Sequence, residues 1–241
     1  MNTVKEHYEN HLGNFYSWMT GDIVPAVKSQ EAEFKELKIL PQKEGNAIDL
    51  GSGHGIQALA LDSLGFNTTA IDFNSQLLCE LEKNSVGSKI RVVNDDILNV
   101  QNYKSLRPEI ISCCGDTISH LHNLEVLGKF FADCNKTLIE NGRIFLTFRD
   151  YSNELSGTQR FLPVKSDDFK ILTCVLDFSK ESVQVTDLLY EKKNGSWVMN
   201  VSSYEKIRLT VGMVESKLLE TGFLIEFKEA GRMNTLLARK K

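Results

Sequence analysis

The order of apolar and polar runs along the chain predicts a core of alternating strands and helices. Short apolar runs predict strands at 47–50, 68–71, 90–93, 109–114 and 143–148. Longer segments between them predict helices at 55–64, 76–83 and 121–140. The strand runs are apolar on consecutive residues, as expected when helices cover both faces of a parallel sheet. The pattern therefore predicts a doubly wound, mostly parallel α/β fold.

This alternation of strands and helices stops after Arg149. Residues 150–210 contain runs rich in β-forming residues and no convincing helix. Turn candidates at 179–181 and 193–195 separate these runs, which predicts an antiparallel β meander inserted into the α/β fold. The α/β pattern then resumes with a helix at 211–221 and strands at 224–228 and 235–239, which brings the core to seven strands.

The chain before the first strand is mostly helical in pattern, with a break at residues 20–22 and an amphipathic helix over 27–40. We therefore divide the molecule into three parts. They are an N-terminal helical cap (1–45), a Rossmann-like cofactor-binding core (46–149 and 211–241), and an inserted β-rich substrate or lid subdomain (150–210).

Composition narrows the class of protein. The chain has 241 residues, of which 41% are hydrophobic and 25% charged, as in a globular domain. The net charge of −4 gives no general support for binding nucleic acid. Five cysteines without C-x-x-C spacing argue against a disulfide framework or a zinc site, and no metal is expected. The polar first ten residues and the absence of a long apolar run lead us to expect a cytoplasmic protein without a membrane segment.

The strongest chemical signal is the segment Asp49-Leu50-Gly51-Ser52-Gly53-His54-Gly55 between the first strand and the first core helix. Glycines there allow a sharp turn and close approach of a ligand to the main chain, and the helix N-terminus offers free N–H groups. The alternative is a tight turn that binds no ligand. A dinucleotide fingerprint would need a third glycine at position 56, which is Ile56 here.

A carboxylate stands at the end of the second strand. Asp72 can accept hydrogen bonds from both hydroxyls of a ribose, as acids do at this position in dinucleotide folds. Asp72 could instead cap the next helix, but Asn74 can fill that position.

The D-x-G-x-G-x-G segment followed by the strand-end acid resembles motif I of the class I S-adenosylmethionine-dependent methyltransferases, with a likeness to the glycine/sarcosine N-methyltransferase branch. The resemblance covers the motifs from Asp49 to Asp116. It implies a seven-stranded sheet with a reversed final hairpin, and S-adenosylmethionine as cofactor. The implied cofactor contacts are Tyr16, Asp49, Gly51, Gly53, Gly55, Asp72, Phe73, Asp96, Ile97 and Cys114.

Within that resemblance, Asp96 would bind the adenine amino group and the Ile97 backbone would contact the ring, with Asp95 as a substitute for Asp96. An acidic turn that caps a short helix is the other interpretation of this pair. Cys114 lies beside the implied methionine position, and the two adjacent cysteines should point to opposite sheet faces.

The candidates for contact with the methyl acceptor are His120, Arg149 and Tyr151. His120 could bind the acceptor, take a proton, or cap the following helix. Arg149 suits a carboxylate, but the segment around it could equally be a salt-bridged loop stem.

The resemblance implies an enzyme that methylates a small molecule. Two other interpretations stay open: a non-catalytic cofactor-binding or interaction protein on the same fold, and an NAD(P)-dependent oxidoreductase. The expected partner is a small-molecule acceptor, with neither nucleic acid nor a membrane, and a homodimer is possible. The inserted sheet would either cover the cofactor site or serve as a dimerisation surface.

Overall fold

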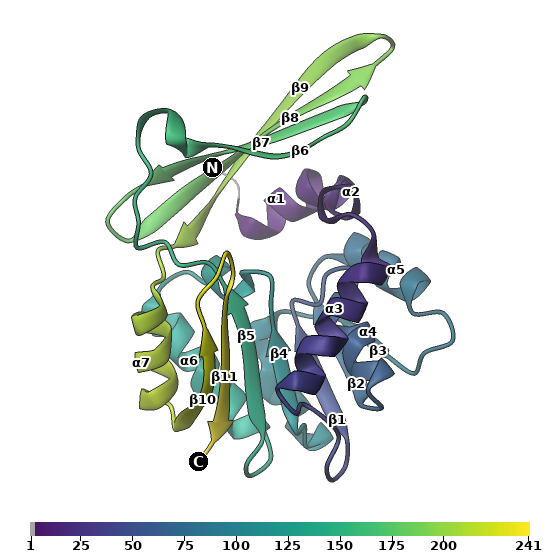
Figure 1. The fold of residues 1–241 in the computed structure, drawn as a ribbon, viewed down its shortest axis with the longest axis vertical. Coiled ribbons are helices and arrows are strands. Elements are labelled where there is room, and N and C mark those ends of the chain that lie inside the picture. The colour runs from purple at the N-terminus through teal and green to yellow at the C-terminus, as the bar shows by residue number, and fades with distance from the viewer. Residues whose placement is uncertain (1–2) are drawn as a thin grey trace.

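A computed structural model describes residues 3–241 and contains two sheets (Figure 1). The larger sheet has seven strands in the order β10-β11-β5-β4-β1-β2-β3, and β11 is antiparallel to both of its neighbours. The strands of this sheet are β1 (Asn46–Leu50), β2 (Asn67–Asp72), β3 (Arg91–Asn94), β4 (Ile110–Cys113), β5 (Arg143–Phe148), β10 (Phe223–Glu229) and β11 (Asn234–Lys240). The predicted seven-stranded sheet with a reversed final hairpin is therefore confirmed.

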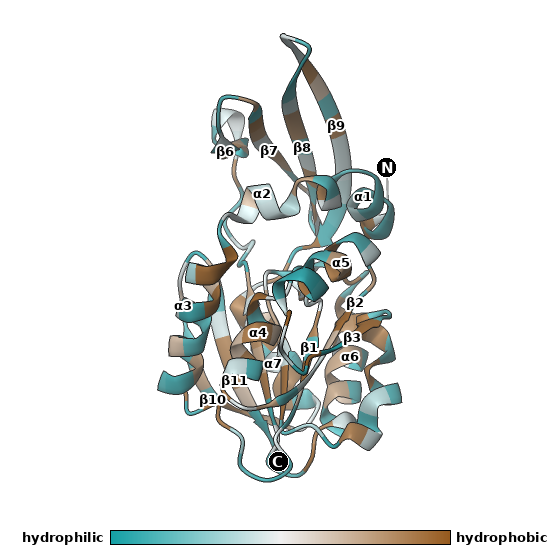
Figure 2. Cartoon of the chain, turned by 90° about the vertical axis from the view of Figure 1, so that its right-hand side faces the viewer, coloured by the Kyte–Doolittle hydropathy of each residue, from teal (hydrophilic) through white to brown (hydrophobic). Residues whose placement is uncertain are grey.

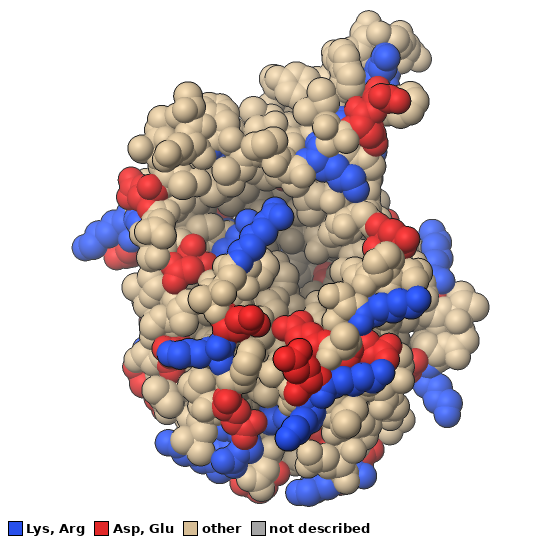
Figure 3. Space-filling model, in the orientation of Figure 1, with Lys and Arg blue, Asp and Glu red and all other residues tan. Residues whose placement is uncertain are grey.

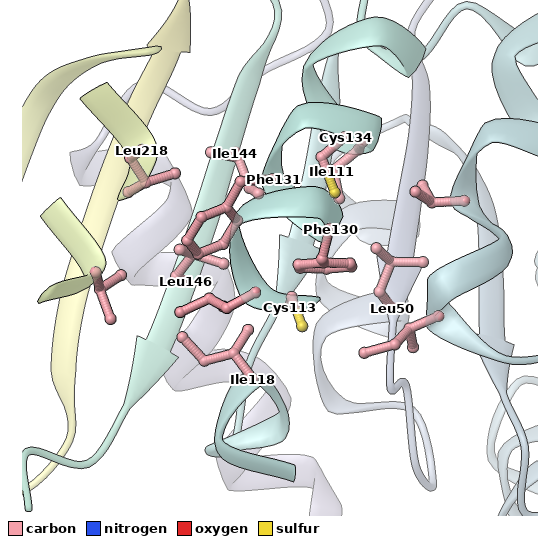
Figure 4. Packing of buried hydrophobic residues seen from close by; sticks show 14 of the residues in the cluster. Leu50, Ile111, Cys113, Ile118, Phe130, Phe131, Cys134, Ile144, Leu146 and Leu218 are labelled. Atoms are coloured by element: carbon pink, nitrogen blue, oxygen red, sulfur yellow. The ribbon is translucent and has the colours of Figure 1, made fainter. Parts of the chain in front are cut away.

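Helices cover both faces of this sheet, as its continuous apolar strands require. The helices are α3 (Ile23–Glu36), α4 (Ile56–Ser63), α5 (Ser75–Asn84), α6 (Leu124–Thr137) and α7 (Val211–Glu220), with the 3-10 helices η2 (Ile97–Leu106) and η3 (Thr117–His120). One face packs against α3, α4 and α5, and the other against η2, α6 and α7. In Figure 4, Phe130 and Phe131 of α6 lie among strand residues that include Leu146 and Cys113. Cys113 and Cys114 belong to the cores on opposite faces, as the alternation along β4 predicts.

The inserted segment forms a second, antiparallel sheet between β5 and α7. Its four strands follow one another in the order of the chain: β6 (Phe161–Ser166), β7 (Lys170–Phe178), β8 (Ser182–Lys193) and β9 (Ser196–Ile207). A short 3-10 helix, η4 (Gly157–Arg160), precedes it. The meander is thus confirmed, but the strand β6 was not predicted. Four of its six residues are exposed and it contains Pro163, so it has the weak pattern of an edge strand.

The N-terminal helices α1 (Val4–Asn10), η1 (Leu12–Asn14) and α2 (Tyr16–Thr20) lie between the two sheets (Figure 1). Leu12 and Phe15 pack against Leu172 and Leu189 of the inserted sheet. The helix expected at 27–40 spans Ile23–Glu36 instead. It begins earlier because the Asp22 side chain accepts a hydrogen bond from the Val24 N–H.

Candidate functional site

A cavity of about 1660 Å³ opens at the carboxyl ends of the parallel strands, beneath α1 and the inserted sheet. Figure 3 shows the hollow between these upper elements and the main sheet. The carboxyl edge is where ligands bind in parallel α/β sheets. Eight of the ten predicted cofactor residues line the cavity: Tyr16, Gly51, Gly53, Asp72, Phe73, Asp96, Ile97 and Cys114.

The glycine loop that follows β1 forms the floor of the cavity. Gly51 and Gly53 have φ of +68° and +52°, which side-chain-bearing residues rarely adopt. A Cβ on Gly53 would stand 3.8 Å from the Tyr16 ring and would project into the cavity. The loop main chain is therefore open to close approach by a ligand at this point.

Asp72 holds the glycine loop against the end of β2. Its Oδ2 accepts a hydrogen bond from the Gly53 N–H, and its Oδ1 accepts one from the Asn74 N–H, each at 2.8 Å. Burial raises the pKa of Asp72. The helix α5 is capped by Asn74, whose side chain accepts from the Leu77 N–H. Asp72 is therefore not the helix cap, and its carboxylate lies on the cavity wall.

The two remaining predicted cofactor residues, Asp49 and Gly55, do not line the cavity. Asp49 is buried behind the loop, where its Oδ1 accepts a hydrogen bond from the Ser112 hydroxyl at 2.7 Å. Its Oδ2 has no hydrogen-bond partner among residues 3–241. Gly55 has a φ of +109°, and a Cβ there would stand 2.9 Å from Leu81. Both residues therefore support the glycine loop from the side that faces away from the cavity.

The two acidic residues that follow β3 make different contacts. Asp95 accepts hydrogen bonds from the Asn99 amide and the Tyr103 hydroxyl, both at 2.7 Å, and these bonds lower its pKa. Asp96 accepts one from the Leu98 N–H and thereby caps η2. The capping interpretation is thus correct for Asp96, although both carboxylates also line the cavity.

The far end of the cavity is a compact polar cluster between η3 and β9. His120 stacks on Tyr204, with ring centroids 5.5 Å apart, and lines the cavity. The Lys206 ammonium lies 2.6 Å from Asp116 Oδ2. Burial, and next the charge of Lys206, lower the pKa of His120 to about 3, so the imidazole is neutral. Its Nδ1 is buried without a partner among the described residues. His120 does not cap α6, because Asn123 does.

Asp116 joins this cluster to the core. It has a left-handed backbone, with φ of +74°, directly after β4. Its carboxylate accepts hydrogen bonds from the Tyr151 hydroxyl at 2.7 Å and the Arg149 N–H at 3.0 Å, besides the Lys206 ion pair. Burial alone would raise the pKa of Asp116, but Lys206 and the Arg149 N–H hold it below its usual value.

Two of the predicted acceptor contacts, Arg149 and Tyr151, are not among the residues that line the cavity. The Tyr151 side chain packs in the core of the inserted sheet, and its hydroxyl is committed to Asp116. The structure therefore brings His120 to the cavity, whereas Tyr151 lies behind its wall and Arg149 does not line it.

The cavity residues that the sequence analysis did not assign include Tyr8 of α1 and Lys206 of β9. Tyr8 lines the cavity from α1, and its ring lies 5.7 Å from that of His120. The helix is held in place by His7, which stacks on Tyr204 at 4.1 Å and whose Nε2 lies 3.2 Å from Asp187 Oδ2. The partners in these pairs are 112 to 197 residues apart in the chain, so no local pattern signals the contacts.

Within residues 3–241, no helix has the length and apolar character to cross a bilayer, and no three His, Cys, Asp or Glu side chains gather as a metal site.

The comparisons with known proteins agree with this geometry. Residues 48–146 match the family model described as a methyltransferase domain. A glycine/sarcosine N-methyltransferase of Aphanothece halophytica is 23% identical over 150 residues, 61% of this chain, and the match spans 57% of that relative's length.

Solved structures share the fold along the whole chain. A S-adenosylmethionine-dependent methyltransferase from Clostridium acetobutylicum superimposes with a TM-score of 0.74 at 19% identity, covering 96% of this chain and 97% of its own. The CcbJ methyltransferase from Streptomyces caelestis gives a TM-score of 0.79 at 13% identity and 98% coverage of both chains. Residues 48–146 therefore match a methyltransferase domain, and the chain as a whole has the fold of S-adenosylmethionine-dependent methyltransferases.

Proposed function

We propose that this protein transfers the methyl group of S-adenosylmethionine to a small molecule bound beneath the inserted sheet. The observation that carries the proposal is one continuous cavity from the glycine loop to the His120 cluster. Its volume of about 1660 Å³ exceeds the roughly 300–1,000 Å³ of a pocket for one small ligand. The cavity therefore has room for a cofactor and an acceptor side by side.

The charges at the glycine-loop end fit this cofactor. Asp72, Asp95 and Asp96 line that end, and no Lys or Arg of the described chain lines it between Gly51 and Leu98. Three carboxylates would repel a pyrophosphate, but they suit a neutral adenosine and a positively charged sulfonium. The acidic end therefore favours S-adenosylmethionine over a dinucleotide.

We assign the cofactor contacts accordingly. A carboxylate has about four acceptor positions, so Asp72 can bind two ribose hydroxyls while it retains the Gly53 and Asn74 N–H groups. Asp96 is the better candidate for the adenine amino group, because Asp95 already accepts from three donors of its own loop. Tyr16, Cys114 and the main chain of Gly51–Gly53 would enclose the rest.

S-Adenosylmethionine supplies an activated methyl group on a sulfonium, so the protein's task is to orient the acceptor and exclude water. The rings of Tyr8 and Tyr16 offer faces that can stabilise a cation. His120 offers a neutral nitrogen that can hydrogen-bond the acceptor without repelling the sulfonium. Lys206 also lines the cavity, and its charge is balanced by Asp116.

Calorimetry tests the cofactor assignment. S-Adenosylmethionine and S-adenosylhomocysteine should bind, and NADH should bind far more weakly; comparable NADH binding would overturn the assignment. A methyl-transfer assay on a panel of small amines, hydroxy compounds and thiols tests the reaction, and amines come first because the curated relative is named an N-methyltransferase. Binding without transfer to any acceptor would favour the non-catalytic alternative. A His120→Ala variant should lose transfer and retain the cofactor.

We also retain as proposals the division into an N-terminal cap (1–45), core and inserted lid (150–210), a cytoplasmic location and a homodimer. Support for the lid is that residues 180–182 and 205–208 line the cavity and α1 packs under the same sheet.

A further inference from the structure

The two faces of the inserted sheet differ in what covers them. Side chains alternate along β8, where Val183, Val185 and Leu189 are buried against the N-terminal segment and Tyr151. The alternate residues, which include Leu188 and Tyr190, point outward. Residues of α1–α2 thus cover the inward face, and the described chain leaves the outward face open.

The outward face is apolar where it should be polar. Three rows of paired residues cross β7, β8 and β9 without a charged side chain: Ile171–Tyr190–Met199, Thr173–Leu188–Val201 and Val175–Thr186–Ser203. The exposed fractions of Ile171, Tyr190, Met199 and Val201 are 40%, 36%, 51% and 53%. Figure 2 shows apolar bands along β7, β8 and β9. A sheet face in water normally carries polar residues, and a contiguous apolar patch of this kind marks an interaction surface.

The size of the patch matches half of a modest interface. Phe161 and Trp197 extend it at its two ends, with 48% and 46% of their surfaces exposed. These six side chains expose roughly 500–600 Å² together, and a standard interface buries about 800 Å² on each partner. The threonine and serine side chains of the three rows can supply much of the remainder.

The charges at the ends of the rows indicate which partner fits. Lys192 pairs with Trp197 at the outer end of the sheet, whereas Asp177, Gln184 and Glu205 form the row at the inner end. Asp177 is already paired with Arg160, which leaves Glu205 as the unneutralised acid of that row. If two copies met face to face about a two-fold axis that lies in the sheet plane and runs perpendicular to the strands, the Lys192 row of one copy would lie over the Gln184–Glu205 row of the other. Each Lys192 would then stand over Gln184, one strand away from the other copy's Glu205.

We infer that the outward face of β7–β9 is the contact surface for a second copy of this chain, which forms a two-fold symmetric dimer. An uncharged apolar face matches itself, and closed two-fold dimers are the commonest assemblies of identical chains. The inference does not depend on the proposed methyl transfer, because the residues at the centre of the face do not line the cavity, whereas Glu205 at its inner end does.

Sedimentation velocity on the full-length chain, up to about 100 μM, tests the inference. The wild type should sediment at twice the mass of one chain. Met199→Lys puts an unpaired ammonium on β9, beside Tyr190 in one of the three uncharged rows, and should raise the dimer dissociation constant roughly 100-fold or more. The matched control is Val86→Lys, which should leave the dimer intact. Val86 is also apolar and is 86% exposed, but it lies on the surface of the α/β domain, away from the inserted sheet.

A wild-type monomer at the highest concentration would overturn the inference, as would a dimer that Met199→Lys leaves unchanged. Val201→Glu serves as a second variant, and circular dichroism checks that each variant is folded. The charge swap Lys192→Glu with Glu205→Lys tests the direction of the axis. Lys192→Glu alone should weaken the dimer several-fold, and the double variant with Glu205→Lys should restore it. A double variant that is weaker than the single one would reject the perpendicular axis. These readouts need neither cofactor nor acceptor, so they stand or fall separately from the proposed function.

Discussion

Asp49 should make the stability of the protein depend on pH. Its carboxyl group is buried beneath the glycine loop, with a single hydrogen bond from Ser112 at 2.7 Å. Burial raises the pKa of Asp49 from 3.8 to about 7. Between these values the folded protein keeps a proton on Asp49 that the unfolded chain releases.

The sign and the size follow from this difference. A raised pKa in the folded state gives a contribution to stability that is complete below the unfolded value of 3.8, falls as pH rises, and is lost above about 7. A rise of about three pKa units corresponds to about 4 kcal/mol, which is an upper bound because buried sites relax around a charge. We therefore expect Asp49→Asn to be about 1–3 kcal/mol more stable than the wild type at pH 8.5, and no more stable near pH 4.

Urea unfolding of the cofactor-free protein at pH values from 4 to 8.5 measures this difference. Far-UV circular dichroism is the better probe, because Trp18 and Trp197 both lie outside the seven-stranded sheet. Asp168→Asn, on an exposed turn, controls for the loss of one carboxylate. If the difference between Asp49→Asn and the wild type were the same at every pH, the carboxyl would ionise as in the unfolded chain and the reasoning would fail.

Three further predictions concern the cavity. Asp72→Asn leaves one acceptor oxygen for the N–H groups of Gly53 and Asn74, so the free energy of unfolding should fall by about 1 kcal/mol. The same variant should bind S-adenosylmethionine more than tenfold more weakly, as measured by calorimetry. Gly53→Ala should lower the free energy of unfolding by about 1 kcal/mol, because the residue has a positive φ, and should abolish most cofactor binding. Gly55→Ala should lower the melting temperature more, because its Cβ would stand 2.9 Å from Leu81. Equal effects of the two variants on cofactor binding would contradict this prediction. Lys206→Met should raise the pKa of His120 from about 3, as followed by NMR titration, and an unchanged value would show that Lys206 has no influence on it.

The sequence predicted the main sheet well because its signals are local. Each buried strand is a short apolar run, and each turn carries residues such as Gly51, Asp72 or Asn141 that allow one backbone geometry. The same locality explains the failures. The 3-10 helix η2 has no regular apolar face, and the edge strand β6 contains Pro163 and has four of its six residues exposed.

The candidate site divides in the same way. Residues of the glycine loop and strand ends could be assigned because their position along a strand fixes their place at the carboxyl edge. Arg149 and Tyr151 follow β5 at that edge too, yet neither lines the cavity, and the Tyr151 hydroxyl is bonded to Asp116. Once the backbone leaves the strand, the position of a residue in the sequence no longer predicts where its side chain points. Here the packing of the inserted sheet determines that direction.

The position of the inserted sheet depends on Asp116, and no local pattern could have shown this. The residue follows β4 in a left-handed conformation that costs a non-glycine residue free energy. Its carboxylate binds Tyr151, at the start of the insertion, and Lys206, near its end. One acidic side chain of the core thus joins both ends of a segment of more than fifty residues. The same bonds place Lys206 close to His120, where its charge adds to the effect of burial in lowering the pKa of the imidazole.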